Sequence, residues 1–348
     1  MNRSVIISLL ALHSWIAVVL AGNLDGNYYA DINNDLFITP KSSAMAGSDV
    51  SLSRNAQPLG NPANLPSDSI NRIELAYAGY YQNAFSTSAL SYVGSIDPKS
   101  SFGVSMSYLW VPEIQEYIDS TTPGPISSAS QFFFRAGYGR LLYRIRNAIE
   151  LSGGAAINGQ RINLIDKNGY GIGLDAGATV RFINSGLTAS LMIENITTSY
   201  TRWSSQYSEF AYPHARLGIG WQREFEYIYG RLSVAYLSPD LFSNEGLNTF
   251  AVDSMPTDDG SGNESAVYVI PDRERVSRNP AVAIFGKYGA EYVIMNRLAF
   301  RAGLNLATLN FTFGAGLGLL DNCAGIDFAY CTHELAPTYK LSVNYKWF

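Results

Sequence analysis

The residues that could carry out covalent chemistry are few and isolated in this chain. A catalytic nucleophile needs a neighbouring base, and the histidines are limited to His13, His214 and His333. His13 lies in an N-terminal segment that is expected to be removed, and no Gly-x-Ser-x-Gly motif lies near the other two. We therefore expect surface histidines and no enzymatic activity.

The two cysteines, Cys323 and Cys331, could pair in an oxidising compartment. If both belong to one extended strand, eight residues at roughly 3.3 Å each place their Cα atoms about 26 Å apart, which is beyond the reach of a disulfide. The sequence therefore predicts two unpaired thiols at opposite ends of a strand, where they cannot share a zinc ion.

Oxygen ligands gather in residues 253–264, which contain Asp253, Asp258, Asp259 and Glu264 together with glycines. Such a loop is compatible with a calcium site or with a solvated acidic loop. The regular ligand spacing of a calcium-binding hand is missing, which favours the solvated loop. We expect neither a metal nor a cofactor.

The first 21 residues have the organisation of a secretory signal peptide. Arg3 precedes an apolar stretch from Val5 to Leu20, and Ala21 ends a small-residue cleavage site. A retained transmembrane anchor is the alternative, although it would need about twenty apolar residues with fewer interruptions. No later apolar run is long enough to cross a bilayer as a helix, which leaves a closed barrel as the other way to span it.

From residue 71 to residue 348 the chain alternates apolar with small or polar residues, as strands with two different faces do. Apolar side chains occupy the even positions from 102 to 110, whereas serine and glycine occupy positions 101, 103, 105 and 107. Residues 172–182 repeat the alternation with Asp175 and Arg181 on the polar face. One lipid-facing side and one lumen-facing side would produce this pattern.

We count fourteen such stretches, which favours an all-β, antiparallel transmembrane barrel of about 14 strands. Connections after even-numbered stretches are short, such as residues 96–99 and 184–185, whereas those after odd-numbered stretches include residues 111–130, 199–213 and 238–279. Outer-membrane barrels have short periplasmic turns and long outer loops, so both termini are expected in the periplasm. The stretches begin near Arg72, Ser86, Ser101, Gln131, Asn147, Tyr170, Gly186, His214, Tyr227, Pro280, Arg297, Asn310, Cys323 and Thr338.

Charged residues are only 15% of the chain, the net charge is -5, and no basic stripe with interleaved aromatics is present, which argues against a nucleic-acid partner. The phase of the strands places a mixed set of charges on the inner face, because the same charges facing lipid would cost several kcal/mol. These residues are Glu74, Arg135, Asp175, Arg181, Glu194, Arg216, Arg231, Lys287, Glu291, Arg301 and Asp327.

Residues 22–70 lack the alternation and are rich in turn-forming residues. Asn61 can cap a helix that begins with Pro62 and Ala63, because the N–H that proline lacks would be unpaired at that position. We predict short helices that plug the lumen, with a disordered periplasmic tail as the alternative. At the other end, Tyr345, Trp347 and Phe348 form an aromatic strand end of the type that barrel-assembly machinery reads, although Phe348 is out of phase by one residue.

These segments resemble the PorV/PorQ branch of the FadL-like outer-membrane proteins, which carry a Gly-Met-Gly-Gly-Ala-type segment and then an Asn-Pro-Ala-Gly-Leu-type segment. Here residues 44–48 read Ala-Met-Ala-Gly-Ser and residues 61–65 read Asn-Pro-Ala-Asn-Leu, so glycines of the pattern are replaced. Further resemblance lies in residues 173–178, 289–292, 313–317 and 326–330, and the whole covers about residues 42–348.

The resemblance implies two functions. PorV-like proteins assist type IX protein secretion by binding cargo signal domains, whereas FadL-like proteins are channels for the uptake of long-chain hydrophobic compounds. The mixed-charge lumen favours the secretion hypothesis and leaves hydrophobe transport as the alternative. The partners implied are outer-membrane lipid and lipopolysaccharide, the barrel-assembly machinery, and secretion-system proteins with their cargo.

Overall fold

The computed structural model describes residues 39–52, 57, 60–67, 70–117, 122–146, 148–165, 167–197, 199–204, 208–211, 213–241, 285–333 and 336–347. The expected signal peptide, the acidic loop at residues 253–264 and Phe348 lie outside these ranges. Within the described ranges, no helix is long and apolar enough to cross a membrane.

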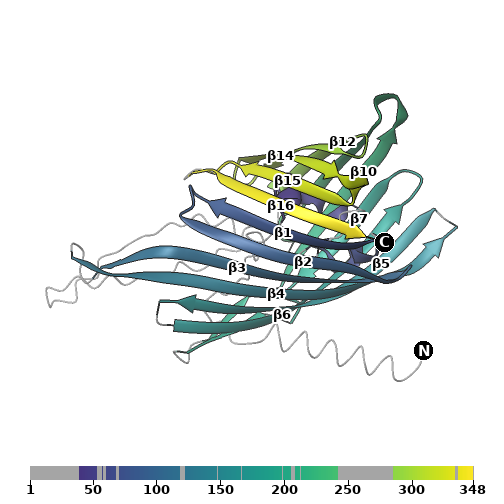
Figure 1. Cartoon of the computed structure of the whole chain (residues 1–348). Coiled ribbons are helices and arrows are strands. Elements are labelled where there is room, and N and C mark those ends of the chain that lie inside the picture. Colours follow the sequence, from purple (N-terminus) through teal and green to yellow (C-terminus); the bar gives the residue numbers. More distant parts are fainter. Residues whose placement is uncertain are drawn as a thin grey trace, which may run out of the picture.

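Fourteen antiparallel strands form one closed barrel, in which β1 pairs with β16 and β5 with β6 (Figure 1). The predicted barrel of about 14 strands is therefore confirmed. The strands are β1 (Asn71–Tyr80), β2 (Phe85–Asp97), β3 (Ser100–Tyr117), β4 (Pro123–Ile145), β5 (Ile149–Leu164), β6 (Lys167–Phe182), β7 (Leu187–Glu194), β10 (His214–Phe225), β11 (Gly230–Leu237), β12 (Lys287–Ile294), β13 (Leu298–Asn305), β14 (Asn310–Leu319), β15 (Ala324–Cys331) and β16 (Thr338–Trp347).

The two faces of the wall follow the alternation of the sequence. On β3, Ser105 and Ser107 are buried, while Met106 and Tyr108 are exposed on the outside. On β6, Asp175 is buried and its neighbour Leu174 is 42% exposed. A closed barrel with exposed apolar side chains on its outer face belongs in a membrane, and this protein is an outer-membrane barrel.

The wall is uneven because β3 to β6 have 16 to 23 residues, whereas β11 to β16 have 8 to 10. We expected residues 111–130 to form a loop, but residues 111–117 extend β3 and residues 123–130 extend β4, so that β4 begins at Pro123 and not near Gln131. A register shift between Val111 and Ile114 accommodates Pro112, which cannot donate to the ladder. The long strands project at the end away from the C-terminus (Figure 1).

A second departure is the hairpin of β8 (Ser199–Trp203) and β9 (Ser208–Ala211), where the sequence indicated a loop. β7 pairs with β6 only from Ala176 to Phe182, which leaves the outer part of β6 without that neighbour. β8 pairs with this part, between Gly169 and Ile172, and β9 pairs with β8. The hairpin thus satisfies a strand edge that would otherwise stay open.

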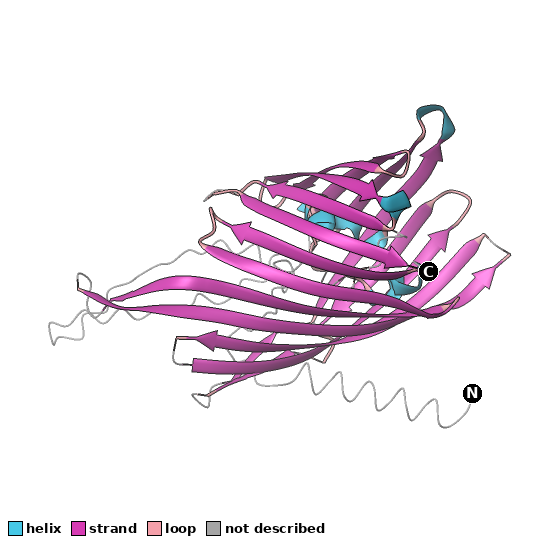
Figure 2. Cartoon of the chain, in the orientation of Figure 1, coloured by secondary structure: helices cyan, strands magenta, loops and turns pink. Residues whose placement is uncertain are grey.

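Three short helices, α3 (Pro40–Ser43), η1 (Ser48–Ser51) and η2 (Pro62–Ser67), lie inside the ring of strands (Figure 2). Two further turns of helix, η3 (Glu226–Ile228) and η5 (Leu320–Asn322), connect strands at the end where the C-terminus lies. Cys331 is the last residue of β15, Cys323 precedes that strand, and both thiols are free as predicted.

Candidate functional site

The candidate site is the plug, formed by residues 39–52 and 60–67, together with the inner wall that holds it. We call residues 39–52 the first plug segment and residues 60–67 the second. In the first, Thr39 is the N-cap of α3 and Pro40 occupies the first turn, where its missing N–H has no effect. The chain reverses at Ala46 and Gly47, which both have positive φ, and enters η1.

The first segment packs against the wall of short strands. Thr312 on β14 holds its turn from both sides, because Thr312 Oγ1 donates to Ala44 O (3.0 Å) and accepts from Ala46 N (3.1 Å). Any Cβ at Gly303 would lie 2.5 Å from Ala46 N, and one at Gly289 would lie 2.7 Å from Met45 O. Glycines of the wall thus allow the plug backbone to approach it closely.

Met45 and Leu52 of the first segment bury their side chains in a small apolar cluster with Ala235 of β11. Inside the segment, the carboxylate of Asp49 accepts from the Ser42 hydroxyl and from Gln57 Nε2 (3.2 Å). Burial raises the pKa of Asp49, whereas the Ser42 hydroxyl and the charge of Lys41 act in the opposite direction. These hydrogen bonds connect α3 with η1 and with Gln57.

The second segment packs against the wall of long strands. Asn61 caps η2 as predicted, since Asn61 Oδ1 accepts from Ala63 N at 2.9 Å. The Nδ2 of Asn61 reaches the wall at Leu191 O (3.4 Å), and Thr179 Oγ1 donates to Asn64 Oδ1 (2.8 Å). Leu65 is buried against Val93.

Together the two segments cross the lumen. The first contacts β7, β10 to β12 and β14 to β16, and the second contacts β3 to β6. Asn64 Nδ2 donates to Val50 O and joins them. The plug is therefore attached to opposite walls of the barrel and lies across its lumen.

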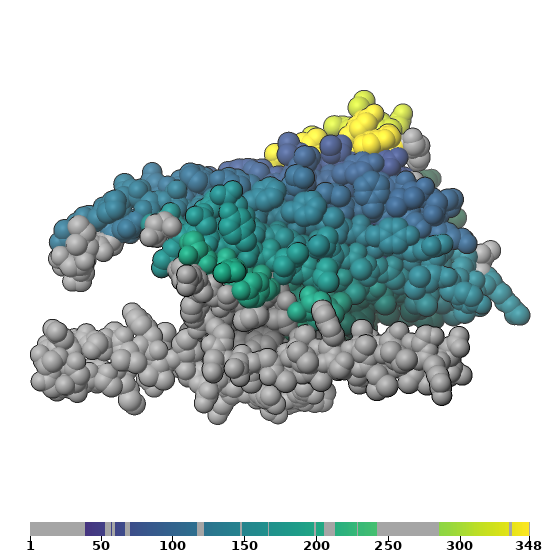
Figure 3. Space-filling model, turned by 90° about the horizontal axis from the view of Figure 1, so that it is seen from below, coloured from purple at the N-terminus to yellow at the C-terminus, as the bar shows by residue number. Residues whose placement is uncertain are grey.

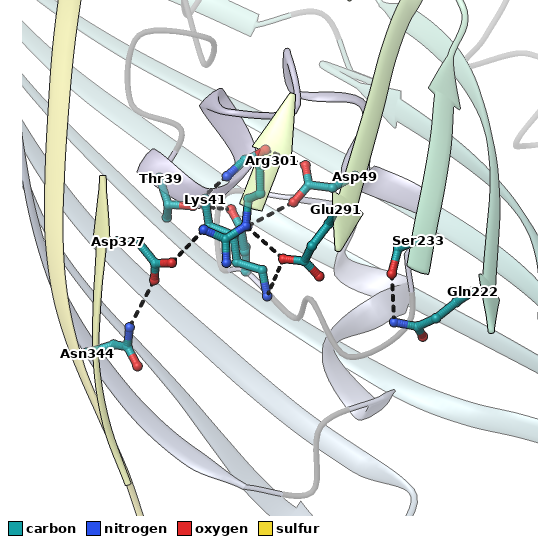
Figure 4. Close-up of polar contacts among 11 residues, drawn as sticks. Thr39, Lys41, Asp49, Gln222, Ser233, Glu291, Arg301, Asp327 and Asn344 are labelled. Atoms are coloured by element: carbon teal, nitrogen blue, oxygen red, sulfur yellow. Dashed lines mark hydrogen bonds and ion pairs between the residues drawn. The ribbon is translucent and has the colours of Figure 1, made fainter. Parts of the chain in front are cut away.

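A charged network anchors the plug to β12, β13 and β15 (Figure 4). The Arg301 guanidinium donates to Glu291 (2.7 Å) and to Asp327 (2.7 Å), and Asp327 also accepts from Asn344 Nδ2 (3.2 Å). The Nζ of Lys41, in the plug, lies 3.9 Å from the Glu291 carboxylate. One wall arginine thus neutralises two wall carboxylates, and one of these attracts the plug.

The long-strand wall has its own ion pair, between Arg135 Nη2 and Asp175 Oδ2 at 2.9 Å, and both side chains are 0% exposed. Asp175 also accepts from Asn158 Nδ2 (3.1 Å) and from Asn195 N (2.9 Å), so both of its carboxylate oxygens are hydrogen-bonded. The Nε and Nη1 of Arg135 have no hydrogen-bond partner. Because such a pair is buried, removing one partner would leave an uncompensated charge.

The other charges predicted to line the lumen also lie on inner-face positions. Glu194 pairs with Arg216 at 3.0 Å, and Arg181 lies 3.4 Å from Glu150. Glu74 is buried, and the remaining two, Arg231 and Lys287, are half-buried. The structure does not gather the eleven into one cluster, and eight of them belong to separate ion-paired groups around the wall.

Sequence reasoning missed several residues of the site. Glu150 and Lys340 share the phase of the inner face and could have been found by extending the alternation, and Lys340 lies over the ring of Tyr80 at 5.2 Å. Thr312 is also in phase, but nothing in its position indicates a contact with Ala44. Lys41 lies in a segment without any period, so no signal could have paired it with Glu291.

At the C-terminal strand, Tyr345 and Trp347 point outward, 49% and 36% exposed. Their rings stack at 6.0 Å between centroids, on the lipid side of β16. Among the described residues, no group of three or more His, Cys, Asp or Glu could hold a metal ion.

Comparison with known proteins agrees with this architecture. The chain is similar to the crystal structure of the P. putida toluene transporter TodX, with a TM-score of 0.51 and 11% identity over 88% of this chain and 97% of that chain. It is also similar to the CymD monoaromatic hydrocarbon channel (TM-score 0.49, 10% identity, 89% and 96% covered). A third is a Pseudomonas aeruginosa FadL homologue (TM-score 0.46, 10% identity, 88% and 98% covered).

No protein-family model matches the chain, and neither does any curated protein sequence. The likeness to TodX, at 11% identity, is a likeness of fold. These neighbours are FadL-type outer-membrane barrels, and they give no support to the PorV/PorQ branch that the sequence segments indicated.

Proposed function

We propose that this protein is a FadL-type outer-membrane channel for small or long-chain hydrophobic compounds. The observation that carries the proposal is the plug, which is attached to opposite walls by Thr312 and Thr179. A barrel obstructed in this way is unsuited to the unselective diffusion of polar solutes. It suits a substrate that enters by binding and passes as the plug yields.

The neighbour with the same fold supports this choice of substrate class, since it is described as a toluene transporter. The outer face adds a physical argument. Hydrophobic compounds partition poorly into the charged and sugar-rich surface of an outer membrane, so a protein route through that surface would accelerate their entry.

The secretion hypothesis rested on the mixed charge of the lumen. The contacts of those charges explain their presence without a protein cargo. Arg135 pairs with Asp175 and Arg216 with Glu194, so they are occupied within the wall. Arg301 neutralises the carboxylates beside the plug. Charges used in this way are structural and do not require a protein cargo.

One comparison in a single deletion strain tests the proposal. We expect slower uptake of toluene and of a long-chain fatty acid, restored by the wild-type gene, with normal secretion of proteins that carry a C-terminal signal domain. A strain with an unrelated outer-membrane barrel deleted controls for general envelope damage. Retention of signal-domain proteins in the periplasm, with hydrophobe uptake unchanged, would reject the proposal in favour of secretion.

A further inference from the structure

A row of four side chains crosses the outer face of the long-strand wall. Cross-strand register aligns Phe132 of β4 with Arg161 of β5, Arg161 with Tyr170 of β6, and Tyr170 with Arg202 of β8. All four are exposed, Tyr170 by 56%. The guanidinium carbon of Arg161 lies 5.7 Å from the centre of the Tyr170 ring. We call these residues the arginine row.

The rows next to it show where the arginine row lies relative to the membrane. On the side toward the C-terminal end, three successive outward-facing rows contain no charged residue, and they include Phe134, Ile157, Leu174 and Ile172. The next charged outward position on β4 is Arg140. On the opposite side, Ser130, Asn163 and Asn168 form a polar row.

Phe132 and Arg140 are eight positions apart, about 26 Å along a strand at roughly 3.3 Å per residue. A tilted strand needs about nine to eleven residues to cross the apolar part of a bilayer. Arginine side chains extend away from the apolar zone, which makes up the difference. The arginine row therefore lies at the boundary between hydrocarbon and head groups, at the end of the long outer strands.

Within the described part of the chain, neither arginine of the row has a carboxylate partner. No ion pair of Arg161 or Arg202 is found among the described residues, and the described outward positions in the adjacent rows are not acidic. By contrast, Arg216 near the same end faces the lumen and is paired with Glu194. Two unpaired guanidinium groups at a lipid boundary require anions from the surroundings.

We propose that Arg161 and Arg202 bind the phosphate groups of a glycolipid in the outer leaflet of the outer membrane, with Tyr170 between them. Guanidinium groups bind phosphate by two parallel hydrogen bonds, and aromatic rings are favoured at the same depth. The two arginines are separated by two strand spacings, about 10 Å, so they would engage a head group with two phosphates. Its acyl chains would lie against Ile172 and Leu174.

The surface that would take the lipid belongs to the blue-to-green strands of the side shown in Figure 3. It lies on the outside of the barrel, away from the plug. The proposal is therefore independent of what passes through the lumen, and either can fail without the other.

Binding of purified lipids to the full-length protein tests it. The double variant Arg161→Gln/Arg202→Gln is compared with wild type for bisphosphorylated lipid A in detergent micelles, by native mass spectrometry. We expect at least about tenfold weaker binding, since charge-assisted contacts to phosphate are lost. Arg140→Gln, an outward arginine at the other end of the same wall, should bind as wild type does.

A set of lipid probes shows which part of the lipid is recognised. Lipid A without phosphates should bind the wild type as weakly as bisphosphorylated lipid A binds the double variant, and inorganic phosphate should not compete. If the wild type binds phosphate-free lipid A as tightly as bisphosphorylated lipid A, only the acyl chains are recognised. If it binds phosphatidylglycerol as tightly, the site is not specific for a glycolipid. Either result overturns the proposal. Heat-modifiable gel migration of each variant shows that the barrel is folded.

Discussion

The side chain of Asn61 occupies the space over Gly177 where any other residue would place its Cβ. Asn61 Oδ1 caps η2 while its Nδ2 reaches the wall at Leu191 O. One asparagine therefore starts the plug helix and positions it on β6, and it can do both only because residue 177 has no side chain.

Gly177→Val should displace the second plug segment, since the added carbons overlap the Asn61 amide and the plug is softer than the strand ladder. We expect larger single-channel currents in planar bilayers and greater sensitivity of cells to large antibiotics. Gly159→Ala is the matched control, because a Cβ there meets only Gly171 O at 3.7 Å. Wild-type currents in Gly177→Val would mean that this contact does not seat the plug.

Thr312→Val should loosen the first plug segment, because Ala44 O loses the hydroxyl that donates to it and Ala46 N keeps its bond to Ser43 O but loses its contact with the wall. Loss of such contacts costs about 1 to 3 kcal/mol. Hydrogen exchange of the amides in residues 42–48 should accelerate, while the amides of β14 exchange as in the wild type. Thr87→Val, at another buried inner-face threonine, controls for the loss of a hydroxyl. Unchanged exchange in the segment would contradict the anchoring role.

Arg301→Gln and Lys41→Gln should differ in both size and kind of effect. Removing Arg301 takes away the guanidinium from which both Glu291 and Asp327 accept, which costs about 3 to 5 kcal/mol and should lower the temperature at which the barrel unfolds in detergent gels. Lys41 is 21% exposed and 3.9 Å from Glu291, so its loss should cost about 0 to 1 kcal/mol and affect only the plug. Equal shifts of the unfolding temperature would show that Glu291 depends on Lys41 as much as on Arg301.

The faces of the strands could be predicted because alternation is local. Ser105 and Met106, or Leu174 and Asp175, differ in polarity at adjacent positions, and burial follows that difference. The positions at which strands end were harder to predict. Pro112 and the run Pro123-Gly124-Pro125 indicate a loop, yet a register shift lets both strands continue past the membrane.

The plug contacts could not be predicted, for a different physical reason. Thr312 and Ala44 are 268 positions apart, and only the closure of the barrel brings them together. Nor does alternation indicate which charges pair. Arg301 neutralises Glu291 and Asp327 on its two sides because β12, β13 and β15 curve around a common lumen, and this hidden pairing made the mixed charge resemble a protein-binding surface.

Leu174→Arg should block assembly or cost about 2 to 4 kcal/mol, since its outward row is the middle one of the three uncharged rows and thus near the midplane. The folded fraction in lipid vesicles against urea measures the effect. Ile172→Arg, one row nearer the boundary, should be milder. Ser105→Arg on the inner face is not a mild control, because Ser105 is 1% exposed and has no room for the larger side chain. Equal loss of folding at residues 174 and 172 would show that the midplane of the membrane does not lie at the row of Leu174.

A cross-link can show whether transport requires the plug to move. A Cβ at Gly218 of β10 would lie 3.2 Å from the Cβ of Ser51, slightly closer than the 3.5 to 4.5 Å usual in disulfides, and no contact there is closer. In a chain with Cys323 and Cys331 replaced by serine, Ser51→Cys/Gly218→Cys should form a disulfide that fixes the first plug segment to the wall. We expect hydrophobe uptake into proteoliposomes to stop on oxidation and to return on reduction, with Gly218→Cys alone unaffected by either. Undiminished uptake by the oxidised protein would mean that substrates pass without separating Ser51 from Gly218. The hypothesis of a moving plug would then be rejected in favour of a fixed path between plug and wall.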